Sequence, residues 1–402
     1  MKNAPSRVEF IAMIAMLFAT IAFSIDAMLP ALPRLAEEFS PDAPNRAQLV
    51  VTSFVMGMGL GTLFTGPLSD TFGRKPVILW GAVLYIASAA VASFAPDLET
   101  LLGARFVQGI AAAAPRVVAL AIVRDLYAGR GMARIMSFVM MVFTVVPALA
   151  PSVGAAFIAW SGWQAVFYAF ITFCTVATTW LWVRLPETLA PEARRPFRAR
   201  ALRSAMVEVV THPVVRLSIA VQGLSFGALF AVISSIQPIY EVTFDKADSF
   251  PLWFALVALL AMSSSYLNAR LVMQVGMRRL VTLMLSFQCV ATAILLAVLL
   301  GGLRGDALFP LFLVWQLGLF FQAGMTLGNL NAIAMEPMGH IAGLAASITG
   351  AISTVVSVLL AAPIGLAFDG TPVPLAVGVL VLCLAALGLM RRMTRVEAQQ
   401  AT

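Results

Sequence analysis

Long apolar runs, separated by short polar breaks, follow one another along almost the whole chain. Twelve of these runs are long enough to cross a bilayer as an α-helix, which takes roughly 17–25 residues. We place them at 9–32, 47–69, 76–95, 100–123, 135–159, 163–183, 214–240, 251–269, 280–301, 307–333, 341–367 and 371–390. Strands of a membrane β-barrel alternate apolar and polar residues over about ten positions, whereas these runs are continuous and longer. The pattern therefore predicts an all-α integral membrane protein with twelve transmembrane helices.

Composition and charge agree with this class and add an orientation. Hydrophobic residues make up 61% of the 402 positions and charged residues 11%, against about 25% charged in an ordinary soluble domain. Most of the 26 lysines and arginines fall in loops that would share one side of the membrane with both chain ends. The positive-inside rule makes that side the cytoplasm, and it explains the net charge of +7 without a nucleic-acid partner. We expect both termini to be cytoplasmic and the first helix to be retained rather than cleaved as a signal peptide.

The longest break divides the chain into two halves. Residues 185–212 form a predicted cytoplasmic linker between six-helix bundles at 1–184 and 213–402. The halves echo each other, because "APSVG" at 150–154 returns as "AAPIG" at 361–365. Two six-helix pseudo-repeats are an architecture of secondary transporters. The arginine-rich part of the linker, 194–203, either lies on anionic lipid headgroups, which is the simpler interpretation, or forms a regulatory patch.

Residues that usually bind metals or perform catalysis are few and scattered. Cys174, Cys289 and Cys383 fall in three different apolar runs, and His212 and His340 lie at predicted cytoplasmic edges. No cluster with metal-ligand spacing surrounds any of them. We therefore predict no metal site, no cofactor and no enzymatic activity.

Three charged residues interrupt the apolar runs and are the main candidates for function. Asp26 and Arg105 each lie about six residues from the predicted periplasmic end of their helices, or about 9 Å deep. Arg116 follows Arg105 by eleven positions, which returns it to within about 20° of the same helix face. Charges inside a membrane are costly and by default mark ion or substrate pathways. This face is therefore predicted to line a central cavity.

Our hypothesis is that Asp26 binds and releases a coupled proton, that Arg105 tunes this proton binding, and that Arg116 contacts substrate. The alternatives are a structural role for Asp26, a structural pair of Arg105 with Asp26 or with backbone carbonyls, and snorkelling of Arg116. Glu9 lies nearer the cytoplasmic surface and is the weaker acid candidate. One acid facing two arginines suits neutral, zwitterionic or weakly acidic substrates better than strongly cationic ones.

Several motifs resemble those of a known family. The stretch "GPLSDTFGRKP" at 66–76 resembles the loop signature of the major facilitator superfamily, and "ARFVQGIAAAA" at 104–114 resembles the Arg-x-x-Gln-Gly motif of its drug:proton antiporters. The stretch "VVPALAPSVGAAF" at 145–157 is similar to the antiporter motif of the fifth helix, with Ala150 and Ala155 where glycines are usual. Over its whole length the chain is most similar to the bicyclomycin and chloramphenicol resistance (Bcr/CflA) branch.

The resemblance implies a cytoplasmic gate around the 66–75 loop. Its residues would be Gly66, Asp70, Gly73, Arg74, Lys75 and, at the end of the fourth helix, Asp125. Arg74 would pair with Asp125, and Asp70 would face the start of the eleventh helix, which stabilises the outward-open state. A static loop staple is the alternative. The second-half copy of the loop has Met273 where Asp70 would align.

Prolines and a glycine in two equivalent helices are predicted to bend them or to let neighbours approach closely. These residues are Pro147, Pro151, Gly154 and Pro363. These residues either take part in functional gating or produce ordinary kinks of membrane helices, and the sequence favours neither role.

The remaining substrate contacts are predicted to form a soft apolar pocket with few hydrogen-bonding groups. With Arg116, the candidates are Gln108, Met140, Phe143, Phe226, Phe230, Gln237 and Tyr240. Helix packing or lipid exposure is the alternative for each of them.

The predicted function is proton-coupled multidrug efflux by alternating access, with phenicol-like or bicyclomycin-like compounds exported in exchange for protons. Protons would be the coupling ion. The partners would be a drug-like small molecule and the lipid bilayer of the bacterial inner (cytoplasmic) membrane, and the chain would act as a monomer. The first alternative is a proton-coupled importer or a metabolite exporter of the same fold, and the second is a receptor or scaffold.

Overall fold

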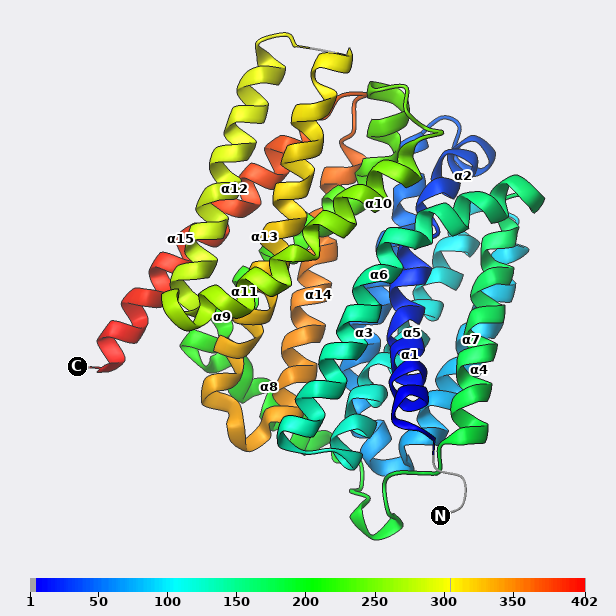
Figure 1. The fold of residues 1–402 in the computed structure, drawn as a ribbon, viewed down its shortest axis with the longest axis vertical. Helices are drawn as coiled ribbons and strands as arrows, with labels where there is room; N and C mark the ends of the chain where they lie inside the picture. Colours follow the sequence, from blue (N-terminus) through cyan, green and yellow to red (C-terminus); the bar gives the residue numbers. More distant parts are fainter. Residues whose placement is uncertain (1–4, 304, 402) are drawn as a thin grey trace. The chain divides into compact units, whose positions relative to one another are not determined.

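The computed structural model describes the backbone of residues 5–303 and 305–401, without the side chains of Arg130, Ala133, Val142, Phe143, Thr144, Gln400 and Ala401. Every regular element in this part of the chain is a helix (Figure 1). The helices separate into two compact units, Met1–Ala199 and Arg200–Thr402.

Eleven helical stretches among the described residues are long and apolar enough to cross a membrane. The longest, Gly305–Leu366, has 62 residues and contains both α13 (Phe309–Met335) and α14 (Ala342–Leu366), which the turn around Met338 joins. This stretch covers the tenth and eleventh predicted spans. The prediction of an all-helical protein that crosses a membrane many times is confirmed. The repeat layout and the cytoplasmic termini stay predictions.

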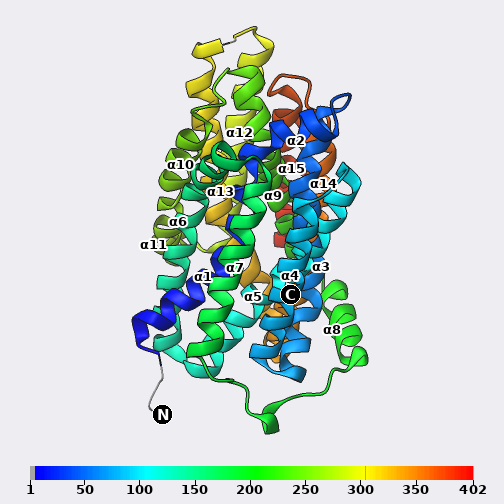
Figure 2. The same ribbon diagram turned by 90° about the vertical axis from the view of Figure 1, so that its right-hand side faces the viewer.

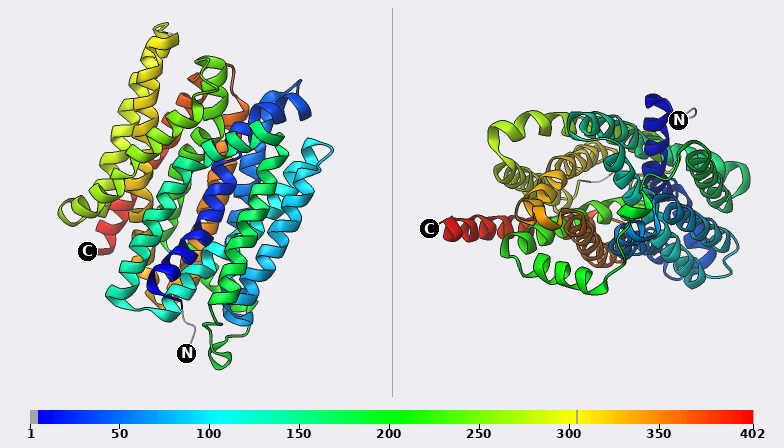
Figure 3. Two further views of the ribbon diagram at one scale, coloured as in Figure 1. Left: turned by 45° about the vertical axis from the view of Figure 1, so that its right-hand side comes forward. Right: turned by 90° about the horizontal axis from the view of Figure 1, so that it is seen from below.

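The first unit is built from seven helices among the described residues. They are α1 (Arg7–Asp26), α2 (Leu32–Phe39), α3 (Leu49–Phe72), α4 (Arg74–Ser93), α5 (Leu98–Leu126), α6 (Gly129–Ser161) and α7 (Gln164–Arg184). α1 runs beside α6 (Figure 3). α3 and α5 meet at glycines, since a Cβ on Gly109 would lie 2.0 Å from the Phe54 carbonyl oxygen. Small residues at such crossings let membrane helices pack backbone against backbone.

The first predicted span, 9–32, is not one straight helix. α1 ends at Asp26, a short 3₁₀ turn (Leu29–Ala31) follows, and α2 continues the apolar stretch to Phe39. Pro30 stands inside this break, and because its ring lacks an N–H and clashes with the preceding turn, it disfavours a continuous α-helix here. The break places the Asp26 carboxylate at a helix end inside an apolar stretch that runs from Arg7 to Phe39.

The second unit contains the other helices of the described chain. Besides α13 and α14 they are α8 (Ala199–Thr211), α9 (Pro213–Pro238), α10 (Phe250–Ala261), α11 (Ser263–Val275), α12 (Met277–Leu300) and α15 (Val373–Ala401). The eighth predicted span is divided at Met262 into α10 and α11. A π-helical turn, Ile239–Thr243, follows α9.

The predicted linker contains a helix that the apolar pattern did not indicate. After α7 the chain runs through an extended loop into α8 (Figure 2). α8 buries Leu202, Ala205 and Val209, which share one face of a helix because they are three and four residues apart. Glu208 on the same helix pairs with His340, with 2.7 Å between its Oε1 and the histidine Nε2. The helix is therefore fastened to the second unit.

Candidate functional site

Arg105 on α5 is completely buried, with 0% of its surface exposed. Its Nη2 donates to the Ser24 carbonyl of α1 at 2.9 Å, and its Nε donates to the Val50 carbonyl of α3 at 3.3 Å. Its Nη1 donates to Gln108 Oε1 at 2.7 Å. All three acceptors are uncharged, and no carboxylate among the described residues pairs with this guanidinium. One planar cation thereby joins three helices.

Aromatic rings complete the surroundings of the Arg105 guanidinium. Its central carbon lies 4.4 Å from the ring centre of Phe54, 5.8 Å from that of Phe170 and 6.0 Å from that of Phe167. Cation–π attraction and the carbonyl dipoles replace the water that the charge has lost. The sequence left two kinds of partner open for Arg105, Asp26 and backbone carbonyls, and in the structure Arg105 donates to backbone carbonyls.

Gln108, a predicted cavity residue, belongs to the same buried cluster, with 0% of its surface exposed. While its Oε1 accepts from Arg105, its buried Nε2 has no partner among the described residues. Ser24 contributes to the cluster twice, because its hydroxyl also shares a short hydrogen bond with the Tyr85 hydroxyl of α4. We call Ser24, Tyr85, Arg105 and Gln108 the Arg105 cluster.

Asp26 is the last residue of α1 and is only 5% exposed. No hydrogen bond or ion pair from the described part of the chain reaches its carboxylate, and the pair with Arg105 is not formed. The carbonyl groups at a helix C-terminus carry partial negative charge, which disfavours an ionised acid at this position. Asp26 is thus a buried acid without a stabilising partner among the described residues.

The other predicted residues of the first-half cavity lie in different surroundings. Arg116 is exposed on α5 and forms no ion pair with a described residue, so it does not share the environment of Arg105. Met140 on α6 is 38% exposed. The Phe143 side chain lies outside the described residues.

Three predicted cavity residues lie along α9 of the second unit. Phe226 is half-buried and stacks on Phe230, with 5.9 Å between ring centres and 21° between planes. Gln237 is 4% exposed, and its Nε2 donates to Glu241 Oε2 at 3.3 Å across the π-helical turn. The buried Oε1 of Gln237 has no partner among the described residues.

Tyr240 lies in the interior of the second unit, with 0% of its surface exposed. Its hydroxyl donates to Gln316 Oε1 on α13 at 2.8 Å. Its ring packs edge-on against the phenylalanines Phe244, Phe250, Phe309 and Phe312. Tyr240 is therefore surrounded by packed helices, which corresponds to the helix-packing alternative for this residue.

The 66–75 loop contains the ion pair that the resemblance implied. Arg74 is buried, and its Nε donates to Asp125 Oδ2 at 2.9 Å. Its Nη1 donates to Ser69 Oγ at 2.8 Å and to the half-exposed Asp70 carboxylate. Ser69 in turn donates its hydroxyl to the Gly66 carbonyl at 2.9 Å. Arg74 therefore fastens the end of α3 and the end of α5 to the start of α4.

Lys75 and Gly73 complete the loop. The Lys75 ammonium donates to the Trp182 carbonyl of α7 at 2.9 Å and lies 4.5 Å from the centre of that indole ring. Gly73 adopts φ 101° and ψ 163°, a conformation that is nearly restricted to glycine. This turn lets α4 begin directly after α3 ends.

Sequence reasoning missed Glu187, which follows α7. Its Oε1 accepts the Arg74 N–H at 2.9 Å and its Oε2 accepts the Lys75 N–H at 3.0 Å. Further along, the Arg195 N–H donates to the Asp70 carbonyl at 2.9 Å. The proline and acid of "LPETL" directly after an apolar run were the available signal, since a carboxylate suits a helix N-terminus.

The turn between α11 and α12 of the second unit also centres on an arginine. Gly276 has φ 85° and ψ 151°, close to the values at Gly73. Arg278 Nη2 lies 2.7 Å from Glu336 Oε2 and 2.7 Å from Glu397 Oε1. Arg278 thereby ties the start of α12 to the end of α13 and to α15.

The predicted bending residues lie inside helices. Pro147 and Pro151 interrupt the hydrogen bonding of α6, as Pro363 does in α14. Gly154 serves close packing, because a Cβ there would lie 2.1 Å from the Ala27 carbonyl oxygen at the end of α1. The glycine thus brings α6 against the residue that follows Asp26.

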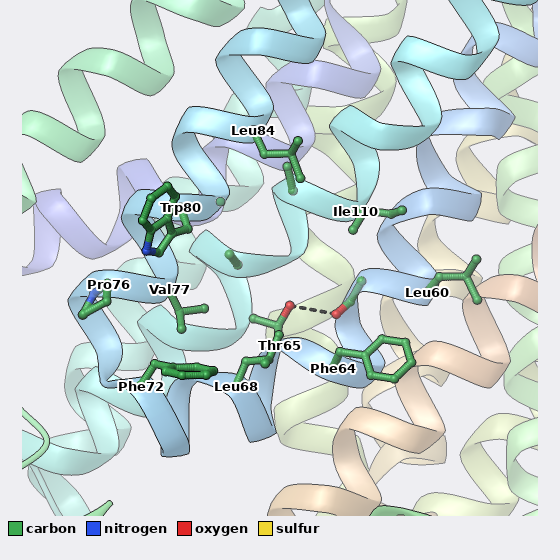
Figure 4. A pocket seen from close by; sticks show the side chains of 14 residues that line it. Leu60, Phe64, Thr65, Leu68, Phe72, Pro76, Val77, Trp80, Leu84 and Ile110 are labelled. Atoms are coloured by element: carbon green, nitrogen blue, oxygen red, sulfur yellow. Dashed lines mark hydrogen bonds between the residues drawn. The ribbon is translucent and has the colours of Figure 1, made fainter. Parts of the chain in front are cut away.

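An apolar groove with a volume of about 680 Å³ lies on the first unit between α3, α4 and α5 (Figure 4). Leu60, Phe64, Trp80 and Ile110 are among its lining residues, and none of the predicted cavity residues is. Thr65 lines it too, but its hydroxyl already donates to the Gly61 carbonyl at 2.7 Å. The groove therefore offers apolar contact with little hydrogen bonding.

Comparison with known proteins decides the family. The model of the Major Facilitator Superfamily matches residues 12–362. The chain belongs to this superfamily. The motif-based prediction is confirmed, and the superfamily consists of transporters rather than enzymes.

Relatives within the superfamily carry resistance names. The chain is 28% identical over 364 residues to the bicyclomycin resistance protein homolog of Haemophilus influenzae, covering 90% of this chain and 89% of that protein. It is 30% identical over 334 residues to the multidrug resistance protein MdtL of Citrobacter koseri, covering 81% and 80%. The crystal structure of a D-xylose–proton symporter superposes with a TM-score of 0.73 at 16% identity, covering 96% and 97% of the two chains, which shows the major facilitator fold alone.

Proposed function

We propose that this protein exports neutral, zwitterionic or weakly acidic lipophilic compounds, of phenicol or bicyclomycin type, in exchange for protons. The resistance names of its relatives support export of such compounds. Transport would proceed by alternating access between the two units, as in other proteins built from repeated helical bundles.

The observation that carries the proposal is the buried carboxylate of Asp26, which no side chain in the described part of the chain partners. An ionised carboxylate is costly to bury without a partner. The protonated and ionised forms of Asp26 therefore differ in stability in this buried position. The Arg105 cluster lies at the same end of α1, and Arg105 holds the Ser24 carbonyl. Proton binding at Asp26 would therefore act on a helix end that three neighbouring helices support.

The proposal includes the setting of the transporter. The chain would reside in a bacterial inner membrane with both termini in the cytoplasm, and a single chain would be the transporting unit. Protons would be its coupling ion, and Arg116 would contact substrate. The 66–75 loop would close the cytoplasmic side, with the Arg74–Asp125 pair intact in one access state and broken in the other.

The decisive experiment uses proteoliposomes with an imposed pH gradient and a phenicol-type compound. Asp26→Asn should abolish uphill transport while exchange of labelled for unlabelled compound, which needs no net proton movement, continues. Glu37→Gln is the matched control, because Glu37 is an exposed acid of α2 with no ion pair among the described residues. Equal uphill transport by wild type and Asp26→Asn would remove the proton-carrying role, and accumulation in the opposite direction would identify an importer.

A further inference from the structure

One carboxylate gathers four backbone N–H groups where the linker leaves α7. Besides Arg74 and Lys75, the N–H groups of Thr188 and Leu189 donate to Glu187 Oε1, at 3.1 and 3.0 Å. Arg74 and Lys75 are the first residues of α4, and the first N–H groups of a helix have no acceptor within the helix. Glu187 supplies that acceptor from outside, and its negative charge complements the positive end of the helix dipole.

The approach of Glu187 explains a residue of the loop signature. A Cβ on Gly73 would lie 2.9 Å from Glu187 Oε2. Glycine at this position therefore serves two needs at once: the backbone conformation and the room for the carboxylate. Thr71 adds a further fastening, because its hydroxyl donates to the Arg195 carbonyl at 2.8 Å. The start of the linker is held along the whole turn between α3 and α4.

The second unit holds its equivalent turn with a similar set of groups. There Arg278 lies between Glu336, directly after α13, and Glu397, near the end of α15. In the first unit Arg74 lies beside Asp125, at the end of α5, and beside Glu187, after α7. Each unit thus places one arginine near two acids. One acid lies at or just after the end of a long helix, and the other lies in the unit's last helix or just after it. The difference is that Glu187 binds backbone N–H groups while Glu397 binds the guanidinium itself.

We propose that Glu187 is a positioning residue of the cytoplasmic gate: it fixes the first turn of α4 so that the Arg74 guanidinium is aimed at Asp125. This role rests on the proposed transport function. The Arg74 guanidinium donates to three side chains, those of Ser69, Asp70 and Asp125. The geometry of these hydrogen bonds depends on the position of the Arg74 backbone. When the gate opens, the Arg74–Asp125 pair breaks while Glu187 keeps the start of α4 in place, so the pair can form again in the same geometry.

The test compares Glu187→Gln with wild type in lipid nanodiscs, by hydrogen exchange resolved to single amides. The Arg74 and Lys75 amides should exchange at least about tenfold faster in Glu187→Gln, because glutamine offers one neutral acceptor oxygen where the carboxylate offers two charged ones, one to each amide. Glu192→Gln is the matched control, since Glu192 is an exposed acid of the same linker with no bond to a described residue. Glu187→Asp keeps the charge on a shorter side chain and should give an intermediate rate, even if Glu187→Gln folds poorly.

A second measurement separates positioning from plain stabilisation. As a single substitution, Glu187→Gln should lower the maximal transport rate severalfold with little change in KM. In an Asp125→Asn background the same substitution should have almost no further effect on that rate, because the pair it positions is already gone. Additive losses in the double variant, or an Arg74 amide that exchanges equally fast in wild type and Glu187→Gln, would overturn the inference. The exchange arm needs no substrate, so a failure of the proposed export would be distinguishable from a failure of this role.

Discussion

The Arg105 guanidinium donates to the main-chain carbonyl of Ser24 at 2.9 Å and forms no ion pair with any described carboxylate. Its fork of N–H groups reaches acceptors on three helices, which a compact ammonium group cannot reproduce. We therefore expect Arg105→Lys to destabilise the protein by about 2–4 kcal/mol, since at least one buried carbonyl loses its charged donor. Thermal unfolding in detergent checks this. Arg116→Lys, an exposed change on the same helix, should shift stability by less than about 0.5 kcal/mol, and equal effects of the two would contradict the structural role of Arg105.

Gly73→Ala should be more damaging than Gly276→Ala. Both glycines have φ near 90° (101° and 85°), so both substitutions carry a backbone cost of about 1–3 kcal/mol. At Gly73 the new methyl group would displace the Glu187 carboxylate, whereas no described atom lies within 4 Å of a Cβ on Gly276. Unfolding temperatures of the two variants measure the difference. Identical losses would mean that the Glu187 approach adds nothing.

Gly154→Ala should separate α6 from α1. Its Cβ would meet the Ala27 carbonyl oxygen at 2.1 Å, and a backbone oxygen cannot rotate away as a side chain can. We expect a loss of about 1–3 kcal/mol, the usual range for overpacking, together with impaired transport. Gly131→Ala on the same helix has open space around it and should be neutral or stabilising by up to about 1 kcal/mol. A Gly154→Ala protein as stable as Gly131→Ala would contradict the close helix crossing.

Asp97 should make the start of α5 sensitive to acid. It accepts the Thr100 N–H at 2.7 Å, and the hydrogen bonds from Thr100 hold the pKa of this carboxyl below its usual value of 3.8. A lowered pKa in the folded state means that the stabilisation is present above pH 3.8 and is lost as the pH falls through the lower folded value. Hydrogen exchange at residues 98–101, corrected for its intrinsic pH dependence, should therefore accelerate in acid. Asp97→Asn keeps a capping oxygen without a titrating group, so its exchange should lose that acid step.

Sequence alone predicted most of the fold because lipid leaves few choices. An apolar run longer than the bilayer is thick must satisfy its own backbone hydrogen bonds, so it becomes a helix. The differences lie inside spans that still hold as single stretches: α1 ends just before Pro30 within the first, and α10 gives way to α11 at Met262 within the eighth. α8 escaped notice because its apolar face is narrow and arginines surround it.

The site was predicted less well than the helices. The resemblance to the superfamily's loop signature implied the pair of Arg74 and Asp125, and the pair is present at 2.9 Å. Arg105 was found from its rarity in an apolar run, but its partners were left open, because a long side chain reaches carbonyls and carboxylates equally well. Glu187 is one of three acids in the linker, with Glu192 and Glu208, and its place after an apolar run and a proline indicates a helix-end carboxylate without naming its partners. Only the folded turn shows that its carboxylate meets the start of α4.

The absence of a described counter-ion at Arg105 has an electrical consequence. Arginine stays protonated near neutral pH, and carbonyl and amide groups do not ionise there. The combined charge of the Arg105 cluster and Asp26 therefore changes only when Asp26 gains or loses its proton. Exchange of one proton for one neutral compound would move one net charge across the membrane, on which a potential of 100 mV acts with about 2.3 kcal/mol. Such a cycle would respond to voltage even when the pH on the two sides is the same.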